Sequence, residues 1–465
     1  MRASDSNSKF AVVIGGSMAG LLTARVLSDH FAHVTVLERD KVGDQPEARK
    51  GQAHTKHLHA LLAAGFEVMT SYFPDLPEAL AEGGAILEDM PLGIRWYGFG
   101  GYRKQFKSGL IGLMTSRPFL EWQIRQRVQA LPNVTLLDEC AVDSLLTTGG
   151  QDQVTGVRYT RRGEMGTVHE LHVDLVVDAS GRGSSAPKWL EVMGYGKPAE
   201  STVKVNVGYA TRIYRRQHGD VEGAFALIAS PDLPDGRRAG YAFPVEGDRW
   251  YMTLSGHAGD YPPTDEEGYL AYARSLPAPD IYNLIRRLEP LTDIVPYRYP
   301  ASVRRHYEKM ARFPEGFLVL GDAICSFNPV YGQGMTSAAL QTKALERLIA
   351  ARGTAGIARP FFKEIAKIVD IPWQLSVGED FRFPETEGKK APGTDLINFY
   401  VEKVHRATQV DTTVYQQFLQ VMNLLAPPSS LMKPRMMWRV FRAVRALRKQ
   451  GAARMEWTEV ADPGR

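Results

Sequence analysis

The chain has 465 residues, which is enough for two domains or for one large domain with an insertion. Its 44% hydrophobic and 23% charged residues are typical of a globular protein, and no run of about 18 apolar residues predicts a membrane-spanning helix. The net charge is +4, but residues 431–454 alone contain eight basic and no acidic side chains. The rest of the chain therefore has a net charge of −4, which excludes a nucleic-acid partner for the main body.

The start of the chain and its cysteines predict the compartment. Residues 1–9 are polar and lack the apolar segment of a secretion signal. The two cysteines, Cys140 and Cys325, cannot form a disulfide framework, so we expect a reducing, cytoplasmic setting. His54, His57 and His59 lie close together, but no second cluster of ligands accompanies them, so we interpret them as loop residues and predict no metal site.

A glycine-rich turn follows the first predicted strand, 10–14. It reads Gly15-Gly16-Ser17-Met18-Ala19-Gly20 and opens a helical pattern, and the next predicted strand, 33–37, ends at Glu38. A strand, a glycine-rich turn, a helix, a second strand and an acidic residue form the fingerprint of a dinucleotide site. The helix N-terminus receives the pyrophosphate, Gly20 lets the helix pack closely on the strand, and Glu38 accepts hydrogen bonds from ribose hydroxyls. Ser17 replaces the middle glycine of this motif, and the neighbouring Gly16 can offset that change.

Two arginines are further candidates for this nucleotide. Arg49 precedes a predicted helix, 57–72, and either reaches a phosphate or the flavin edge or is simply solvated. Arg117 lies at the start of a predicted helix, 119–130, which Thr115 or Ser116 can cap and whose first turn suits Pro118. A cation is unfavourable at a helix N-terminus unless an anion faces it, so we expect Arg117 to meet the pyrophosphate, with Arg125 as a weaker candidate.

An aromatic segment separates these two regions. Residues 94–106 contain Trp96, Tyr97, Phe99, Tyr102 and Phe106 interleaved with glycines, an alternation that predicts strands with one aromatic face. These side chains either line an apolar substrate pocket or belong to the core of a sheet.

The middle of the chain reads as strands. Predicted strands 134–137, 141–146, 154–159 and 171–177 lead to a second small-residue turn that begins with Asp178-Ala179. Strands then follow without intervening helices at 203–213, 223–228, 240–245 and 250–256, joined in part by the hairpin turn at Gly247 and Asp248. Helices at 265–275 and 280–288 and a strand at 297–306 complete a predicted antiparallel sheet inserted in the nucleotide domain.

A third turn follows the predicted strand 317–320. It starts at Gly321-Asp322, is stiffened by Pro329, and passes through Gly332, Gln333 and Gly334 into a predicted helix that begins at Met335. The free N–H groups of that helix favour negative charge, as on a reduced flavin. Taken alone, such a turn is also an ordinary strand-to-helix corner.

The rest of the chain is helical by pattern. The predicted helices are 336–352, 361–375, 396–425 and 432–449. The last one places Arg435, Arg439, Arg442, Arg445 and Arg448 opposite Met437, Val440, Phe441, Val444 and Leu447. This basic amphipathic helix either lies on an anionic membrane surface or packs on its own protein with a solvated arginine face.

Together these patterns predict a mixed α/β fold: a Rossmann-like nucleotide-binding domain, which the resemblance given next identifies as FAD-binding, with an inserted antiparallel-sheet substrate domain and C-terminal helices. The FAD-binding parts are 1–90, 116–200 and 311–355. The substrate domain comprises an excursion at 91–115 and the main segment 201–310, and 356–465 is the C-terminal helical region.

The three turns resemble those of the flavoprotein monooxygenases of the para-hydroxybenzoate hydroxylase fold. Four segments are similar in sequence to the epoxidases of polyether-antibiotic biosynthesis, of the lasalocid and monensin type. They are 15–20, Arg49-Lys50-Gly51, 176–184 and 328–332. The resemblance implies FAD, with Glu38 on the adenosine ribose, Arg117 near the pyrophosphate, Asp322 on the ribityl or pyrophosphate region and 332–335 under the flavin ring. The residues expected to contact FAD are Gly15, Gly16, Ser17, Met18, Ala19, Gly20, Glu38, Arg39, Arg49, Arg117, Arg125, Val142, Asp178, Ala179, Asp322, Gly334 and Met335, and those of the flavin-ring loop are Pro329, Gly332, Gln333 and Gly334.

Two comparisons within this superfamily refine the expectation. Aromatic hydroxylases usually carry Asp-Gly at the middle turn, where this chain has Asp178-Ala179, so electrons from NADPH or NADH reach FAD either directly or through a separate flavin reductase. The Trp-x-Trp-x-Ile-Pro motif of flavin halogenases is absent from the sequence, which disfavours halogenation.

The resulting hypothesis is an FAD-dependent monooxygenase of secondary metabolism that transfers one oxygen atom from a flavin C4a-hydroperoxide to an apolar, alkene-containing substrate. Epoxidation needs no side-chain base, whereas phenol hydroxylation does, and Tyr209, Tyr241 and His257 are the positions to examine for one. An aromatic hydroxylase of the same fold and an FAD-dependent reductase or dehydrogenase of prenyl chains are the alternatives. A non-enzymatic nucleotide-binding protein is a third class.

Overall fold

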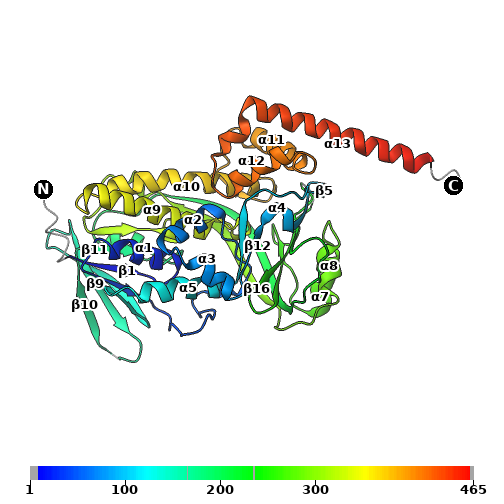
Figure 1. Ribbon diagram of the computed structural model, residues 1–465. Coiled ribbons are helices and arrows are strands. Elements are labelled where there is room, and N and C mark those ends of the chain that lie inside the picture. The colour runs from blue at the N-terminus through cyan, green and yellow to red at the C-terminus, as the bar shows by residue number, and fades with distance from the viewer. Residues whose placement is uncertain (1–8, 165, 234–235, 461–465) are drawn as a thin grey trace.

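The computed structural model describes residues 9–164, 166–233 and 236–460 (Figure 1). Residues 1–8 of the polar N-terminal segment therefore lie outside the described residues. Within the described chain, two large sheets pack with helices into one elongated body, from which the C-terminal helix extends. The predicted mixed α/β fold class is confirmed.

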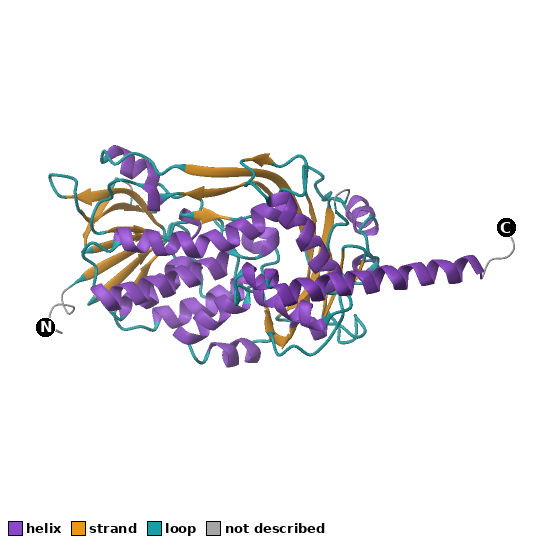
Figure 2. Ribbon diagram, turned by 90° about the horizontal axis from the view of Figure 1, so that it is seen from above, coloured by secondary structure: helices purple, strands orange, loops and turns teal. Residues whose placement is uncertain are grey.

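A parallel sheet of five described strands forms one end of the body, in the order β17-β11-β1-β2-β7. The strands are β1 (Phe10–Ile14), β2 (His33–Leu37), β7 (Val134–Leu137), β11 (Leu175–Asp178) and β17 (Phe317–Val319). Most of their side chains are buried, as continuous apolar runs in a parallel sheet predict. Helices lie side by side over this sheet (Figure 2). Among them, α9 (Gly334–Arg352) contacts α1 (Met18–Ser28), α2 (Ala63–Tyr72) and α10 (Ala358–Asp380), and α1 also contacts α5 (Arg117–Gln129).

The register of this sheet brings three turns to one edge. Ile14 pairs with Asp178, and Asp178 pairs with Val319. The N–H of Ala179 donates to the carbonyl of Ile14 at 2.9 Å, and the N–H of Leu320 donates to the carbonyl of Asp178 at 2.9 Å. Because the strands are parallel, their carboxyl ends coincide, so the turns that begin at Gly15, Ala179 and Gly321 leave the sheet side by side.

A small antiparallel sheet packs against β11. It consists of β8 (Cys140–Thr147), β9 (Val154–Arg161) and β10 (Val168–His172). The single strand predicted at 171–177 is wrong, because the chain passes from β10 into β11, which belongs to the parallel sheet. The break falls at Asp174, whose carboxylate accepts a hydrogen bond from the N–H of Phe10 at 2.8 Å and so starts the pairing with β1.

The second large sheet is antiparallel except at one edge, as predicted for the inserted segment. Its strands are β12 (Glu200–Arg215), β13 (Ala226–Ala229), β14 (Arg238–Val245), β15 (Arg249–Gly256), β16 (Val295–Arg305), β18 (Cys325–Ser326) and β19 (Glu387–Gly388), joined by β4 (Ile94–Gly98) and β5 (Gly101–Tyr102). The hairpin between β14 and β15 turns at Gly247 and Asp248, which have φ of 72° and 50°. The aromatic segment thus joins this sheet, where β4 runs parallel to β13. A separate two-stranded ribbon pairs β3 (Ile86–Asp89) with β6 (Ile111–Met114).

The predicted helices are present with three corrections, and the short helices at 76–82, 90–93 and 186–192 were not predicted. The helices of the structure are α1 (Met18–Ser28), α2 (Ala63–Tyr72), α3 (Leu76–Glu82), α4 (Met90–Gly93), α5 (Arg117–Gln129), α6 (Ala186–Val192), α7 (Glu266–Arg274), α8 (Asp280–Ile285), α9 (Gly334–Arg352), α10 (Ala358–Asp380), α11 (Thr394–Ala407), α12 (Thr412–Met422) and α13 (Pro434–Val460). Helix α5 begins as predicted: the Ser116 hydroxyl accepts from the N–H of Phe119 at 3.3 Å, and Arg117 and Pro118 occupy the first turn.

The predicted helix 57–72 is wrong in its first part. Only α2 is helical, whereas 57–62 is extended after a short 3-10 turn, η2 (Ala53–Lys56). Tertiary hydrogen bonds hold this segment: Nδ1 of His57 lies 2.8 Å from Oγ1 of Thr211, and the N–H of Leu62 donates to Oγ1 of Thr336 at 3.2 Å. These bonds connect residues far apart in sequence, so the local pattern could not reveal them.

Two other predicted helices differ from the structure. The predicted helix 396–425 is interrupted and forms two helices, α11 and α12, because the Asp411 carboxylate caps α12 by accepting from the N–H groups of Thr413 and Val414 at 2.9 and 3.1 Å. The predicted helix 361–375 extends through Pro372 to Asp380 as α10. This extension carries Asp380 to the third turn.

The C-terminal helices pack on the side of the second sheet, and α13 runs away from the body (Figure 1). Val440, Ala443 and Val444 of α13 are buried against α11 and α12, whereas Phe441, predicted on that face, is 47% exposed. None of the helices in the described residues is long and apolar enough to cross a membrane. Cys140 and Cys325 are both buried free thiols.

Candidate functional site

One cavity of about 1040 Å³ opens along the edge where the three turns leave the parallel sheet. It extends from these turns to the inner face of the second sheet and to the C-terminal helices. The predicted site residues that line it are Gly15, Ser17, Met18, Ala19, Glu38, Arg39, Arg117, Val142, Ala179, Asp322, Pro329, Gly332, Gln333, Gly334 and Met335. Three turns that are distant in sequence therefore share one cavity. The interpretation of these turns as parts of one nucleotide site depended on this arrangement.

Five predicted contact residues do not line the cavity. Gly16 and Gly20 shape the first turn from behind, and a Cβ on Gly20 would lie 1.7 Å from the carbonyl oxygen of Gly15. Asp178 is fully buried and accepts from the N–H of Ser180 at 2.9 Å, so it shapes the second turn. Arg125 points elsewhere and donates to the carbonyl of Gly43 at 2.8 Å. Arg49, the fifth, lies beneath the cavity wall in the charge network described next.

Behind the first turn lies a buried network of two acids and two arginines. Glu38 accepts from the N–H of Gly16 at 2.8 Å and lies 2.9 Å from Nη1 of Arg49. Glu121 lies between the guanidinium groups of Arg49 and Arg117, with 2.7 Å between its Oε2 and Nη2 of Arg117. Burial alone would raise the pKa of Glu121, but the two guanidinium groups outweigh it and hold the pKa below its ordinary value.

This network fits a dinucleotide at the first turn. Ser17 donates to Glu121 at 2.9 Å and accepts from Nη2 of Arg117 at 3.0 Å, so Arg117 is fixed at the start of α1. Its Nη1 is buried and has no hydrogen-bond partner among the described residues. An anion at the α1 N-terminus would supply that partner, and the helix dipole favours negative charge there. The carboxylate of Glu38 keeps lone pairs for a ribose hydroxyl.

The third turn combines a left-handed glycine with the start of a long helix. After the 3-10 turns η4 (Gly321–Ala323) and η5 (Pro329–Tyr331), Gly332 has a φ of 66°, and a Cβ there would lie 2.8 Å from that of Ala60. Helix α9 starts at Gly334, and its first N–H groups have no partner within the helix. The side chain of Asp322 is open to the cavity, and the surrounding protein raises its pKa to about 6, against the attraction of Arg182 and Arg117.

A buried carboxyl at the end of α10 holds this turn. Oδ1 of Asp380 accepts from Nδ2 of Asn328 at 2.8 Å and from the hydroxyl of Tyr331 at 3.0 Å. Oδ1 of Asn328 in turn accepts from the hydroxyl of Tyr209 on β12 at 3.2 Å. Burial raises the pKa of Asp380 to about 7, and its Oδ2 has no hydrogen-bond partner in the described residues. Asp380 thus positions the turn and connects it to the second sheet.

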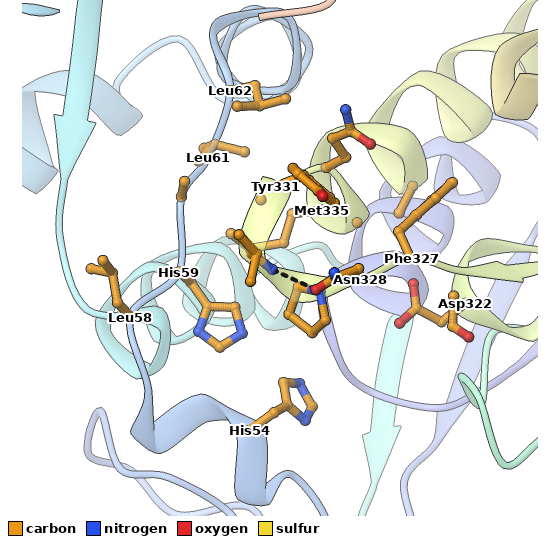
Figure 3. A pocket seen from close by; sticks show the side chains of 18 of the residues that line it. His54, Leu58, His59, Leu61, Leu62, Asp322, Phe327, Asn328, Tyr331 and Met335 are labelled. Carbon is orange, nitrogen blue, oxygen red and sulfur yellow. Dashed lines mark hydrogen bonds between the residues drawn. The ribbon is translucent and has the colours of Figure 1, made fainter. Parts of the chain in front are cut away.

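A histidine-bearing segment, residues 54–62, forms the wall opposite the third turn (Figure 3). His54, His57 and His59 all line the cavity, although the sequence placed them in an ordinary polar loop. Burial lowers the pKa of His54 and of His57 to about 4, so both imidazoles are neutral near pH 7. No group of three or more His, Cys, Asp or Glu in the described residues has the arrangement of a metal site.

The far end of the cavity is aromatic, and sequence patterns identified only part of it. Trp96 and Phe99 of the aromatic segment line it, whereas Tyr97, Tyr102 and Phe106 do not. Other lining residues come from the C-terminal helices and were not predicted, because helical periodicity does not show which groove a helix will cover. They include Tyr400, Val401, His405, Phe418, Leu431 and Met432.

Comparisons with known proteins give one relative by sequence. No family model matches the chain. Protein Rv3254 of Mycobacterium tuberculosis is 35% identical to it over 398 residues, which cover 82% of this chain and 82% of that protein.

Several solved structures share the fold of this chain. A flavoprotein/dehydrogenase from Cytophaga hutchinsonii superposes with a TM-score of 0.66 at 14% identity, covering 95% of this chain and 99% of that one. The p-nitrophenol 4-monooxygenase PnpA of Pseudomonas putida gives 0.61 at 15% identity, with 90% and 98% covered. The flavin-dependent brominase Bmp2 gives 0.59 at 13% identity, with 95% and 100% covered. The fold expected from the three turns is confirmed, and the likeness to polyether epoxidases remains a prediction from sequence motifs.

Replacing Asp380 by Asn should change how stability depends on pH. An ordinary Asp titrates near 3.8 when unfolded, whereas Asp380 titrates at about 7 in the fold. Between these values only the folded state keeps the proton, so stability falls as pH rises. We expect Asp380→Asn to match the wild type near pH 4 and to be more stable at pH 8, by on the order of 4 kcal/mol at most. Urea unfolding across this pH range measures the difference.

The control is Asp395→Asn, which removes an exposed carboxylate whose side chain is 83% accessible. It should leave the pH dependence unchanged. A slope in Asp380→Asn equal to that of the wild type would contradict a raised pKa at Asp380.

Proposed function

This chain belongs to the family of Protein Rv3254 of Mycobacterium tuberculosis, and we propose that it is an FAD-dependent monooxygenase. The observation that carries the proposal is the shared cavity at the carboxyl ends of β1, β11 and β17. Ligands of open α/β sheets bind outside the carboxyl ends of the strands. The cavity volume of about 1040 Å³ lies just above the range of about 300–1,000 Å³ typical of ligand pockets, which supports a cofactor together with a substrate.

The residues of the three turns would bind FAD along its length. Glu38 would hold the adenosine ribose, Arg117 and the α1 N-terminus the pyrophosphate, and Asp322 the ribityl region. Residues 332–335 would lie against the flavin ring, where the N–H groups of α9 favour negative charge. Bound FAD would supply the oxygen activation that no amino-acid side chain provides. Arg49 and Glu121 would act indirectly by fixing Arg117 and Glu38.

We propose an apolar, alkene-containing substrate and its epoxidation as the reaction. The three candidate bases are poorly suited to deprotonating a phenol near neutral pH. Burial raises the pKa of Tyr241 to about 12 and that of Tyr209 further above its ordinary value, and it lowers the pKa of His257 to about 4. His57 is similarly a weak base. Epoxidation needs no such base, so these surroundings support it over aromatic hydroxylation.

The electron source is proposed to be NADPH or NADH, acting directly or through a separate flavin reductase. The second turn packs tightly on the first, since a Cβ on Gly15 would lie 2.7 Å from the carbonyl oxygen of Ala179.

A cytoplasmic location is part of the proposal and is supported by the two buried free thiols.

Oxygen dependence tests the reaction class. Protein loaded with FAD and supplied with NADPH, a flavin reductase and an alkene probe, oleate or geranylgeraniol, should form an epoxide that carries one ¹⁸O atom from ¹⁸O₂. One oxygen molecule should be consumed for each product molecule, and no product should form under nitrogen. Mass spectrometry and an oxygen electrode give both measurements. Turnover under nitrogen with loss of the double bond would instead favour the prenyl reductase.

Replacing Gly334 by Ala separates cofactor contact from folding. A Cβ at this position would meet nothing closer than Oδ1 of Asp322 at 3.7 Å, so the fold should tolerate it. The methyl group would occupy space beside the α9 N-terminus where the flavin ring is proposed to lie. We expect the midpoint of thermal unfolding without FAD to be unchanged and the FAD affinity to fall by roughly tenfold, since overpacking typically costs 1–3 kcal/mol.

The matched control is Gly149→Ala, which lies in an open turn with no atom within 4 Å of the added Cβ. It should leave both quantities unchanged. If Gly334→Ala bound FAD with unaltered affinity, the flavin ring would not lie at this position.

A further inference from the structure

A buried arginine at the aromatic end of the cavity has no part in the proposed FAD site. Arg103 is 5% exposed, and its side chain lines the cavity. Its guanidinium carbon lies 3.7 Å from the ring centre of Trp96 and 4.6 Å from that of Phe418. Its Nη2 donates to Nδ1 of His405, 2.8 Å away. The cation is therefore held in place by aromatic rings and by a neutral imidazole.

The charge of Arg103 is not compensated within the described chain. Among the residues that the structure describes, its Nε and Nη1 have no hydrogen-bond partner. Glu379, a carboxylate whose charge acts on Arg103, already pairs with Arg382 at 2.8 Å. Burial lowers the pKa of Arg103 to about 10, which reflects the cost of keeping a cation out of water. Buried charges in proteins are normally paired, so the missing partner points to a ligand.

The ring of Phe99 packs on the same group of side chains. With Gly100 it forms the tight turn between β4 and β5, where both residues have a positive φ, 55° and 82°, as such a turn requires. The ring of Phe99 stacks on that of His405 with 4.2 Å between centroids, and His405 accepts the hydrogen bond from Arg103. The stack therefore helps to position the guanidinium of Arg103.

We propose that Arg103 binds a carboxylate at one end of the otherwise apolar substrate. This assignment depends on the proposed function in one respect, which is that it identifies the ligand of Arg103 as the substrate. A single guanidinium in an aromatic surrounding suits one negative charge, and a carboxylate is the common anion that an apolar chain carries. The aromatic and apolar lining then surrounds the hydrocarbon part, so the substrate class is an unsaturated long-chain acid.

The test compares two probes that differ only at the end group, oleate and oleyl alcohol. Binding to the full chain loaded with FAD is measured by titration calorimetry, without turnover. We expect the wild type to prefer oleate by roughly 10- to 100-fold, the range for hydrogen bonds to a charged group. Arg103→Met should bind both probes alike, and Arg103→Lys should keep part of the preference because the charge remains.

The control is Arg95→Met, which removes an arginine of the same sheet edge that pairs with Asp280 at 3.1 Å and does not line the cavity. It should keep the preference. Equal binding of both probes to the wild type, no binding of oleate, or an unchanged preference in Arg103→Met would each overturn the assignment. Because no oxygen chemistry is measured, a failed monooxygenase assay would leave this result intact.

A second and independent feature is an exposed apolar face on the C-terminal helices. Large apolar side chains are seldom so exposed: Leu396 of α11 is 73% accessible and Trp438 of α13 is 59% accessible. The other exposed members are Ile397 and Phe399 of α11, Met432 before α13, and Phe441 of α13. Ile397 and Met432 also line the cavity, so part of this face borders it.

The same face is strongly basic. Arg435, Arg442, Arg445, Arg448 and Lys449 are exposed on the side of α13 that carries Trp438 and Phe441, and residues 434–449 contain no acidic side chain. Arg439 differs, because it pairs with Asp411 at 2.9 Å. On α11, Asp395 and Glu402 are each paired with a neighbouring basic side chain. Aromatic and basic side chains on one exposed face match the interfacial region of an anionic bilayer.

We propose that this face docks on an anionic lipid bilayer and that the apolar substrate enters the cavity from the lipid. Co-sedimentation of the full chain with vesicles of phosphatidylcholine and phosphatidylglycerol, in equal parts, tests the docking. We expect binding to these vesicles at low salt, weaker binding at high salt, and little binding to phosphatidylcholine alone. Arg442→Gln and Arg445→Gln should each lower the affinity by roughly fivefold, and Trp438→Ser should lower it further.

Two controls remove one exposed apolar and one exposed basic side chain elsewhere on the protein. Val192→Ser changes a residue that is 82% exposed on α6, and Arg162→Gln changes an arginine side chain that is 71% exposed. Both should bind vesicles as the wild type does. Absence of vesicle binding, an equal loss in the controls, or a dimer that Trp438→Ser dissociates while vesicles are ignored would each overturn the proposal. The last outcome would identify a second copy of the chain as the occupant.

Discussion

The register of the parallel sheet is the constraint on which the site depends. Ile14, Asp178 and Val319 are paired neighbours, so the turns that follow them start from one line at the edge of the sheet. Parallel strands place all their carboxyl ends at the same edge, and each turn there must avoid its neighbours. Gly15 and Gly20 satisfy that condition, since a Cβ on either would collide with a backbone oxygen. The cavity is the space that remains beyond these turns.

The buried arginines around the cavity differ in their counter-charges. Arg49 and Arg117 share the carboxylates of Glu38 and Glu121, and the proposed pyrophosphate would supply a partner for Nη1 of Arg117. Arg103, at the opposite end, has no ion-paired carboxylate among the described residues, and there a ligand carboxylate is proposed. Burial lowers the pKa of His57 to about 4, which keeps its imidazole neutral near pH 7, and it raises the pKa of Asp380 to about 7. One cation is thus proposed to hold the cofactor and the other the substrate, at opposite ends of the cavity.

Sequence patterns predicted the parts of this arrangement that arise from local geometry. The glycine spacing at 15–20, the cap at Ser116 and the glycines at 332 and 334 each follow from what the backbone allows within one turn. The patterns did not predict residues placed by tertiary contacts. His57 lines the cavity because of Thr211, which is 154 residues away in sequence, and Asp380 reaches Asn328 because α10 continues past Pro372. Arg103 and His405 meet across a separation of 302 residues, for which periodicity holds no information.

The C-terminal helices both line the cavity and carry the exposed apolar face. They complete the aromatic wall through His405 and Phe418, and the exposed apolar face borders the cavity through Ile397 and Met432. An enclosed cavity needs a covering element, and an apolar substrate needs a route that avoids water. One group of helices can satisfy both needs only if its inner side packs on the cavity while its outer side remains apolar. The buried Val440 and Val444 and the exposed Trp438 and Phe441 divide α13 in this way, so the exposed aromatic residues are better explained by contact with lipid than by an incompletely packed core.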